Sequence, residues 1–286
     1  MIKTEINKNQ LLARVTEIVK RLPPVPNNVD RILTLSKNSE INSHKIISLV
    51  KEDPGLCVDV IHLAKQAHNN PNSISSIDDA CKLLGPSPII ELIRFCYAKK
   101  TIRERFSVLK YLKHFFQHSR KISKSCRILA VTAGESKHKT ELYATAGLIH
   151  DIGRLVIALA SDSLNAPLLG STPKQIATID HDEKRILGLS HSQVGWQLCK
   201  KWNFSNILQQ AVLRHHNPIQ NKNFNKPAAF IFTAHLLSFG DLNDQIICTS
   251  FAKQLLTGIN ITEHNFIKAR EKFLSEENTE QIMNYC

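Results

Sequence analysis

The chain has 286 residues, of which 42% are hydrophobic and 22% are charged, and its net charge is +12. This length leaves room for one large or two ordinary domains, and the composition is that of a folded protein. No apolar run approaches the length of a membrane span, and the N-terminus lacks the apolar part of a signal peptide. The seven cysteines form no CxxC pair. We therefore expect reduced thiols in a cytoplasmic protein without membrane contact.

Most of the positive charge lies in residues 94–127, which we call the basic segment. It has eleven Lys and Arg against one acid, Glu104, and so carries +10 of the net +12. Such charge attracts phosphates, nucleic acid or an acidic partner protein. A solvated helix surface explains it more simply, because no nucleic-acid-binding module or interleaved aromatic pattern accompanies it. We do not expect nucleic acid among the partners, and contact with a protein through the basic segment is the stronger hypothesis.

The first part of the chain shows the apolar periodicity of helices. Proline-rich residues 22–26 predict an extended entry. Asp53 and the proline after it are typical of a helix start. Ser76, with Asp79 three residues later, resembles a capping box, and Gly85 indicates where that helix ends. The expected helices cover about residues 28–37, 43–51, 54–68, 76–84 and 89–96.

The same periodicity continues through the second part, and no strand-like alternation is evident. Helices are expected over about residues 109–131, 140–151 and 155–160, then after the N-caps Ser190 and Ser205, and around His235. We therefore predict an all-α protein of two helical lobes. Their boundary is placed near residue 105, which gives an N-terminal lobe over 1–105 and a C-terminal lobe over 106–286. Because no flexible linker separates them, the lobes should pack together.

Several of these predicted helices carry a histidine on the apolar stripe that should face the core. The residues are His118, His150 with Asp151, His191, His215 with His216, and His235. A single histidine of this kind usually has one hydrogen-bond partner in a core. Burying several imidazoles together is tolerable if they share a partner, and a divalent metal is such a partner. Histidine with aspartate suits Fe, Mn, Zn or Ni, and the absence of cysteine disfavours a structural zinc site.

His150 and Asp151 are adjacent near a predicted helix end. Neighbouring residues on a helix point about 100° apart, so both reach one ion only where the backbone turns away. Gly153 would permit such a turn. Because a carboxylate has two oxygens, Asp151 could bridge two ions. The sequence predicts a site for one or two metal ions in the C-terminal lobe, with either His215 or His216 facing it.

Residues 147–154, Gly-Leu-Ile-His-Asp-Ile-Gly-Arg, resemble the signature of the HD phosphohydrolase superfamily. The resemblance implies an HD-like helical bundle in the C-terminal half. It implies that His118 takes the first ligand position of that superfamily. His191 and His215 or His216 match the additional ligands of dinuclear members. His235 stands where a late aspartate is expected, and Arg154 stands where a lysine is frequent.

A closer resemblance is to the HDOD domain, an HD-related output domain of bacterial signalling. It covers roughly residues 15–220. The matching motifs are residues 22–26, 52–56 and 80–85, then Glu183, Gly188, His191, Gly195, Trp202 and residues 215–218. This resemblance implies a regulatory protein that acts by protein contact, with a vestigial or metal-loaded pocket. It favours a regulator over an enzyme.

The alternative is a metal-dependent phosphohydrolase acting on a nucleotide or another phosphate-bearing small molecule. The resemblance then implies one metal held by His118, His150, Asp151 and His235. A second metal would lie on His191 and His215 or His216, with Asp151 bridging. Catalysis would rest on Asp151 and on Arg154, which would offset charge on the phosphoryl oxygens. Asn217 and Pro218 follow His216 in place of the Gly-Tyr-Pro segment of cyclic-di-GMP phosphodiesterases, which argues against that substrate.

Overall fold

The computed structural model describes residues 7–22, 43–51, 74–85, 112–162, 176–202, 204–238 and 249–283, and single helical positions between 57 and 65 and between 89 and 101. These residues form helices and one short β-hairpin, so the all-α prediction is confirmed. The elements are α1 (Lys8–Arg21), α3 (Ser43–Lys51), α5 (Ile77–Leu84), α7 (Leu112–Thr132), α8 (Lys137–Ile149), α9 (Ile152–Asp162), α10 (Ile179–Leu187), α11 (His191–Lys201), α12 (Asn206–Arg214), β1 (Ile219–Gln220), β2 (Asn223–Phe224), α13 (Lys226–Ser238), α15 (Ser250–Gly258) and α16 (Glu263–Met283).

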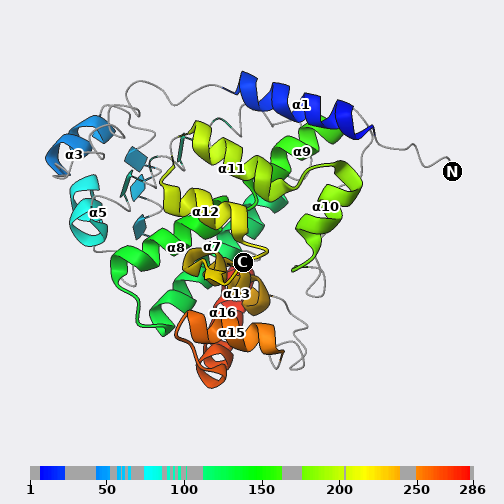
Figure 1. The fold of residues 1–286 in the computed structure, drawn as a ribbon. Coiled ribbons are helices and arrows are strands. Elements are labelled where there is room, and N and C mark those ends of the chain that lie inside the picture. Colours follow the sequence, from blue (N-terminus) through cyan, green and yellow to red (C-terminus); the bar gives the residue numbers. More distant parts are fainter. Residues whose placement is uncertain are drawn as a thin grey trace.

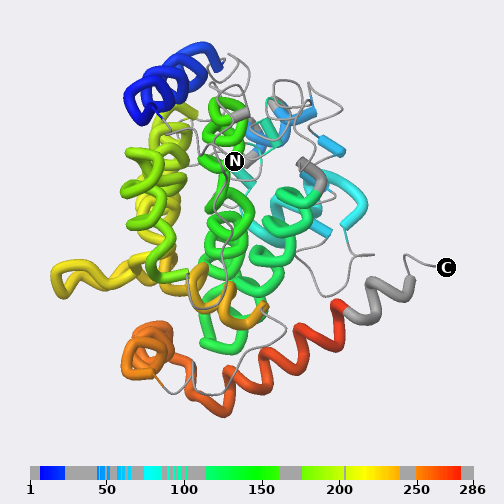
Figure 2. Tube along the Cα trace, turned by 90° about the vertical axis from the view of Figure 1, so that its right-hand side faces the viewer, coloured from blue at the N-terminus to red at the C-terminus, as the bar shows by residue number. Residues whose placement is uncertain are grey.

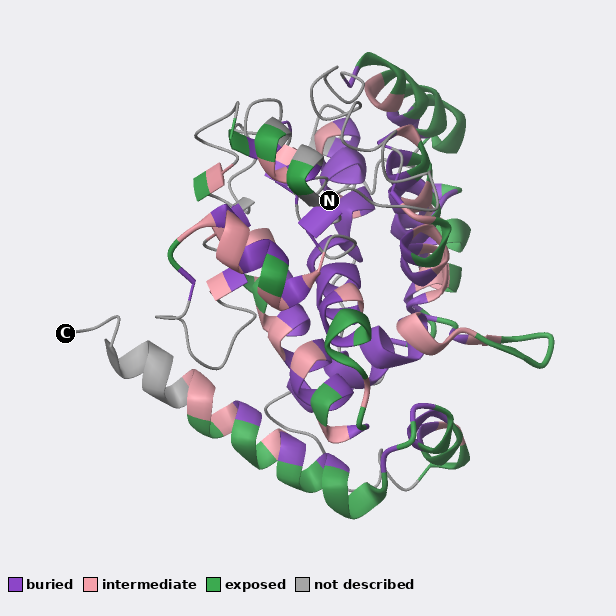
Figure 3. Cartoon of the chain, turned by 90° about the vertical axis from the view of Figure 1, so that its left-hand side faces the viewer, coloured by how far each residue is buried: buried purple, intermediate pink, exposed green. Residues whose placement is uncertain are grey.

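The helices around α7 and α8 make up the main body of the molecule. α7 packs against α8, α13 and α16, while α9 packs against α11 and α1. Figure 1 shows α3 and α5 at one side of this body, α1 across one end, and α15 and α16 at the other end. Figure 2 shows α16 running along the base of the bundle. Buried residues concentrate in the central helices, whereas α16 exposes one side along its length (Figure 3).

Two N-terminal helices form where the sequence predicts them. The helix expected over residues 43–51 is α3. Ser76 caps α5 by accepting a hydrogen bond from Asp79 N, while Asp79 accepts one from Ser76 N. Gly85 ends α5 with a φ of 81°. The predictions for residues 23–26, 28–37 and 52–56 lie outside the described residues.

The boundary between α8 and α9 differs from the sequence prediction. α8 begins at Lys137, because Ser136 caps it, and it ends at Ile149. Gly153 is therefore not the end of that helix but the second residue of α9. A Cβ atom on Gly153 would overlap His191 O and would lie 2.5 Å from Gly195 N. The absent side chain thus lets α9 approach α11 closely, and this contact fixes the spacing of two helices at the site described next.

The sequence analysis missed α1, α10 and the hairpin of β1 and β2. α1 precedes the extended entry, and Lys201 of α11 donates hydrogen bonds to its last carbonyls, Val19 O at 2.9 Å and Lys20 O at 2.8 Å. The hairpin of β1 and β2 has two residues with positive φ at its tip, Asn221 (51°) and Lys222 (63°), as a type I′ turn requires. Strands of two residues are too short for alternation to indicate them.

Contrary to the expectation from the sequence, residues 137–161 are long and apolar enough to cross a membrane, judged only by length and composition. In the fold they are two helices, α8 and α9, separated by a turn at His150 and Asp151. Of the apolar window, 83% is buried inside the bundle. A core segment of a folded protein gives the same pattern, so this stretch is weak evidence for a membrane span.

Part of the basic segment is paired with acids of the same chain. Arg127 forms a bidentate ion pair with Glu141, with both N–O distances at 3.0 Å. Lys124 Nζ lies 3.4 Å from a carboxylate oxygen of Glu276 and 3.6 Å from one of Glu277, both on α16. These two cations of α7 therefore help to hold α8 and α16 in place.

Candidate metal centre

All seven residues singled out in the sequence come together in one place. They lie on α7 (His118), the turn between α8 and α9 (His150, Asp151), the start of α11 (His191), the end of α12 (His215, His216) and α13 (His235). The histidines other than His118 are no more than 2% exposed, and Asp151 is 5% exposed. The His118 side chain is 35% exposed and marks the side of the site that solvent reaches.

Local helix-end chemistry places several of these side chains. Ser190 caps α11 by a reciprocal capping box with Gln193, which puts His191 at the first helical position. His215 is the C-cap of α12, and the chain turns there, so that both His215 and His216 face inward. Ser205 occupies the N-cap of α12 as expected, but its side chain forms no capping bond.

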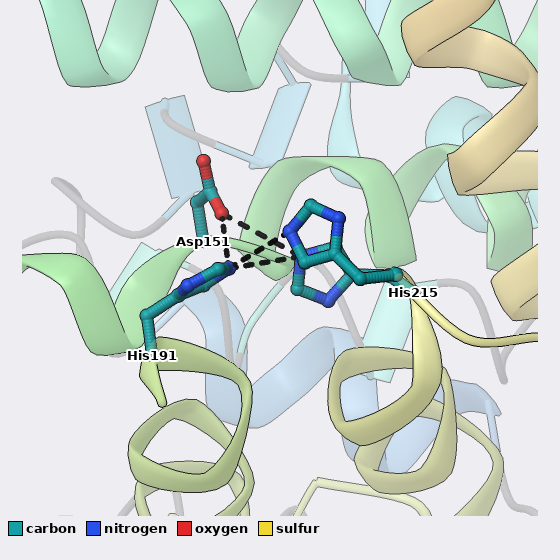
Figure 4. Close-up of side chains that lie close together, drawn as sticks. Asp151, His191 and His215 are labelled. Atoms are coloured by element: carbon teal, nitrogen blue, oxygen red, sulfur yellow. Dashed lines mark hydrogen bonds and ion pairs between the residues drawn. The ribbon is translucent and has the colours of Figure 1, made fainter. Parts of the chain in front are cut away.

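Three histidines gather around one oxygen of Asp151, and we call them the inner cluster. Asp151 Oδ1 lies 3.1 Å from His191 Nε2 and 3.6 Å from His215 Nε2. His191 Nε2 lies 3.2 Å from His215 Nε2 and 3.1 Å from His216 Nε2. Figure 4 shows the Asp151 carboxylate facing the rings of His191 and His215, which come from different helices.

The other three histidines gather on the other side of Asp151, and we call them the outer cluster. Asp151 Oδ2 lies 3.3 Å from His150 Nε2 and 3.6 Å from His118 Nε2. The His235 ring centroid is 4.8 Å from that of His150 and 5.3 Å from that of His118. The two oxygens of one carboxylate therefore face two groups of imidazoles, which adjoin where the ring centroids of His150 and His215 lie 5.1 Å apart.

Hydrogen bonds to the protein set the tautomers of four histidines. The Nδ1 atoms of His150, His215 and His235 lie 2.8, 2.7 and 3.0 Å from backbone carbonyls, which can only accept a proton. His191 Nδ1 lies 2.6 Å from Glu183 Oε2. Each Nδ1 therefore carries the hydrogen, and in the neutral ring each Nε2 presents a lone pair. The Nε2 atoms of His150, His191 and His215 face Asp151.

Glu183 is a site residue whose role sequence reasoning missed. It is 3% exposed, and its Oε2 also accepts a hydrogen bond from His191 N at 2.7 Å. Glu183 lies on the buried stripe of α10 with Ile179 and Leu187. An acid on an apolar stripe is the same signal that identified the histidines, and it could have identified Glu183 as well.

Among the described residues that form ion pairs with Asp151, Arg154 is the nearest. Its Nε lies 2.9 Å from Asp151 Oδ1, and its Nη1 lies 3.9 Å from Glu183 Oε1. Burial alone would raise the pKa of Asp151, but Arg154 and His150 outweigh it and hold that pKa well below its usual range. Asp151 is thus ionised at neutral pH.

The histidines differ in their protonation. Burial lowers the pKa of His118 to about 4, and neighbouring His150 adds to this effect. Burial also lowers the pKa of His215, and it lowers those of His216 and His235 strongly. Burial and Arg154 act in the same direction on His191, but hydrogen bonds to Asp151 and Glu183 raise its pKa to about 8.

The donor set fits a divalent transition metal. His150 Nε2 is fully buried without a hydrogen-bond partner and faces a carboxylate oxygen, an arrangement that a shared cation would stabilise. A tetrahedral ion with bonds of about 2.1 Å separates its ligand atoms by roughly 3.4 Å. The separations of 3.1 to 3.6 Å within the inner cluster match this value. Imidazole with carboxylate suits Fe, Zn, Ni or Mn.

A third group of possible ligands, Asp180, Glu183 and His191, surrounds the far side of the His191 ring. Its His191 atom is Nδ1, which donates to Glu183 and so has no lone pair for a metal. Asp180 accepts a hydrogen bond from Ser192 Oγ at 2.8 Å. This group therefore orients His191, as second-layer carboxylates do at metal sites.

Solved structures with the same fold include two bacterial proteins. A "putative phosphohydrolase" of Shewanella amazonensis SB2B is 21% identical, with a TM-score of 0.65 over 92% of this chain and 94% of that one. A "putative signal transduction protein" of Marinobacter aquaeolei VT8 is 18% identical, with a TM-score of 0.62 over 98% of this chain and 66% of that one. At these identities the similarity establishes the fold alone.

Sequence comparison identifies the family. An uncharacterized protein of Treponema pallidum (strain Nichols) is 21% identical over 223 residues, which are 76% of this chain but only 42% of that protein. The chain thus spans less than half the length of this relative. The HDOD domain family model matches residues 22–218, more than half of the chain. The protein belongs to the HDOD family, as its motifs predict.

Proposed function

We propose that this chain is a regulatory HDOD protein of cytoplasmic signal transduction, that its C-terminal lobe holds a divalent metal, and that it acts on a partner protein by contact. One observation supports the proposed metal site: Nε2 lone pairs from separate helices converge on the Asp151 carboxylate. The membership of the HDOD family supports the signalling role.

The placement of the ligands supports a link between metal binding and shape. They come from α7, the turn between α8 and α9, α11, α12 and α13, so a bound ion would tie these elements together. Binding energy at such a site becomes folding energy of the lobe. Metal loading would therefore change the rigidity of the surface that a partner contacts.

The state of the cysteines agrees with a reducing compartment. Cys57, Cys81 and Cys126 are free thiols, and Cys81 and Cys126 are buried. Burial raises the pKa of Cys81 to about 11, which keeps this thiol protonated and unreactive. Such thiols act as small core residues, as in proteins of the cytoplasm.

Thermal unfolding with and without metal tests the proposal. For the metal-stripped full chain, Zn²⁺ or Mn²⁺ at 100 times its dissociation constant should stabilise by about 2.7 kcal/mol and raise Tm by about 5 °C or more. Asp151→Asn removes the negative charge between the clusters and should abolish this shift. Asp182→Asn, at a half-buried position of α10 outside both clusters, should keep it. A wild-type Tm that no divalent metal raises would contradict a metal-loaded lobe.

A second candidate is phosphoester hydrolysis at the same centre, and the part-exposed His118 favours it. Its 35% exposure provides a way for a small anionic molecule to reach the outer cluster. When bound, a divalent ion supplies a water of lowered pKa for attack on phosphorus. Arg154 pairs with Asp151 Oδ1, on the inner side of the carboxylate, and would offset charge on phosphoryl oxygens that reach that side.

An assay on a panel of nucleotides and phosphoesters separates the two candidates. The regulatory protein should show no turnover with Fe²⁺, Mn²⁺, Zn²⁺ or Ni²⁺. Turnover that Asp151→Asn abolishes, in a variant whose circular dichroism matches the wild type, would establish the enzyme. Turnover that survives Asp151→Asn would come from a contaminant and would leave the regulatory proposal in place.

A further inference from the structure

Building on the metal binding proposed above, we propose that Arg154 makes the two clusters unequal. The chain then holds one divalent ion tightly, in the outer cluster of His118, His150 and His235. It takes a second ion into the inner cluster only at much higher metal concentration. Arg154 acts here as a built-in cation on the inner side of Asp151.

The ion pairs of Asp151 carry this inference. Asp151 supplies the carboxylate of the site and lies within ligand distance of His191, His215 and His216 as a group. Its Oδ1 faces His191, whereas its Oδ2 faces His150 and His118 of the outer cluster. Arg154 Nε lies 2.9 Å from Oδ1. Within the part of the chain that the structure describes, the ion pairs of Oδ2 involve only His118 and His150. A permanent positive charge therefore already sits at one oxygen and not at the other.

In the outer cluster, the ion pairs of Asp151 Oδ2 within the described residues bring only imidazoles, and no guanidinium, to the carboxylate. His150 Nε2 is buried without a hydrogen-bond partner and points at Oδ2 from 3.3 Å, so two electron-rich atoms face each other. A metal ion between them would satisfy both. In the inner cluster the same ion would have to share Oδ1 with the guanidinium of Arg154, and the two positive charges would repel each other.

Glu183 offsets part of this repulsion. Its Oε1 lies 3.9 Å from Arg154 Nη1, compared with 2.9 Å between Arg154 Nε and Asp151 Oδ1. Its other oxygen is already engaged by His191 N and Nδ1. Of these two carboxylates with which Arg154 forms ion pairs, Asp151 is the nearer. A unit charge about 4 Å from a divalent ion can change its affinity by well over 100-fold, so after this offset we expect the two dissociation constants to differ by about 100-fold.

Cobalt titration of the metal-stripped full chain measures the two affinities without any assay of activity. Visible absorption of Co²⁺ follows coordination, and equilibrium dialysis with elemental analysis counts the ions. Wild type should bind one ion tightly and a second about 100-fold more weakly. Arg154→Met keeps the length of the side chain but removes its charge, and should bind two ions with similar affinity. Arg154→Lys keeps the charge and should resemble wild type.

Ligand variants assign the tight ion to a cluster. His235→Ala should remove the tight ion, while His215→Ala should keep it and lose the weak one. This pair decides the assignment even if Arg154→Met does not fold, which circular dichroism would detect. Two equally tight ions in wild type, or loss of the tight ion in His215→Ala alone, would overturn the inference but leave the metal centre intact. A wild-type chain that binds no ion would refute the metal centre itself.

Discussion

Glu183 shows how one side chain can control the site without touching the ligand atoms. Its carboxylate accepts hydrogen bonds from the backbone and from the ring of His191, at 2.7 and 2.6 Å. It thereby fixes both the orientation of the ring and the position of its proton. At metal sites such a partner typically contributes 10- to 100-fold in metal affinity. Glu183 is in this sense a positioning residue.

Replacing Glu183 with glutamine should lower the pKa of His191 in the metal-free protein. The hydrogen bonds to Glu183 and Asp151 raise that pKa to about 8, against burial and Arg154. Without the charge of Glu183 the lowering influences prevail, so we expect a value at or below about 6.5. NMR titration of the imidazole nitrogens measures it. Asp182→Asn, on the same helix, is the control, and an unchanged His191 pKa in Glu183→Gln would exclude the positioning role.

At the scale of elements, the contact between α9 and α11 sets the width of the inner cluster. Gly153 and Gly195 face each other there, and a Cβ on either residue would meet its neighbours at short distance. At Gly153 the obstacles are backbone atoms, His191 O and Gly195 N. At Gly195 the closest atom is the end of a side chain, Val212 Cγ1 at 2.9 Å.

This difference predicts unequal effects of alanine at the two glycines. Gly153→Ala forces backbone atoms of two helices apart and should reduce the free energy of unfolding by about 3 kcal/mol or more. Gly195→Ala meets a side chain that can rotate and should cost about 1 kcal/mol. Urea unfolding of both variants measures the change. Equal effects would indicate that α9 and α11 are not in backbone contact.

At the scale of the whole molecule, burial keeps most of the histidines at the metal-free site neutral. Burial lowers the pKa of His118, His215, His216 and His235, whereas His191 alone is raised, to about 8. His118 is partly exposed, so solvent screening reduces its share. The unfolded chain, with histidine pKa values of about 6.5, therefore takes up more protons below that pH than the folded one.

The stability of the metal-free protein should fall as the pH is lowered from 7 to 5. The four histidines with lowered pKa stabilise the fold when they are neutral, and this contribution is lost below about pH 6.5. His191 affects the pH dependence in the opposite direction. Its protonated form stabilises the fold, and this contribution is fully present below about pH 6.5 and is lost as the pH rises through about 8. Stability should thus peak between these values.

Urea unfolding across this pH range tests the expectation. His235→Gln should reduce the dependence on pH, because it removes one buried imidazole that protonates on unfolding. His264→Ala, at an exposed position of α16, should leave the dependence unchanged. A free energy of unfolding that is constant between pH 7 and pH 5 would be inconsistent with neutral histidines in the core.

Local chemistry accounts for what the sequence determined by itself. Helical periodicity without strand alternation was sufficient to predict the all-α class. The Ser76 capping box and Gly85 were sufficient to predict where α5 begins and ends. The candidate ligands were identifiable because an imidazole on an apolar stripe is costly to bury unless it has a partner. These signals depend on residues within a few positions of one another along the chain.

Only the tertiary structure decided how the ligands divide between the two oxygens of Asp151. It also showed that both His215 and His216 face inward and that Arg154 pairs with Oδ1. It gave Gly153 a role in helix packing in place of the expected turn. The physical reason is the separation along the chain of the residues that come into contact. These distances follow from how helices far apart in the sequence approach one another, and that approach depends on the shapes of whole helix faces.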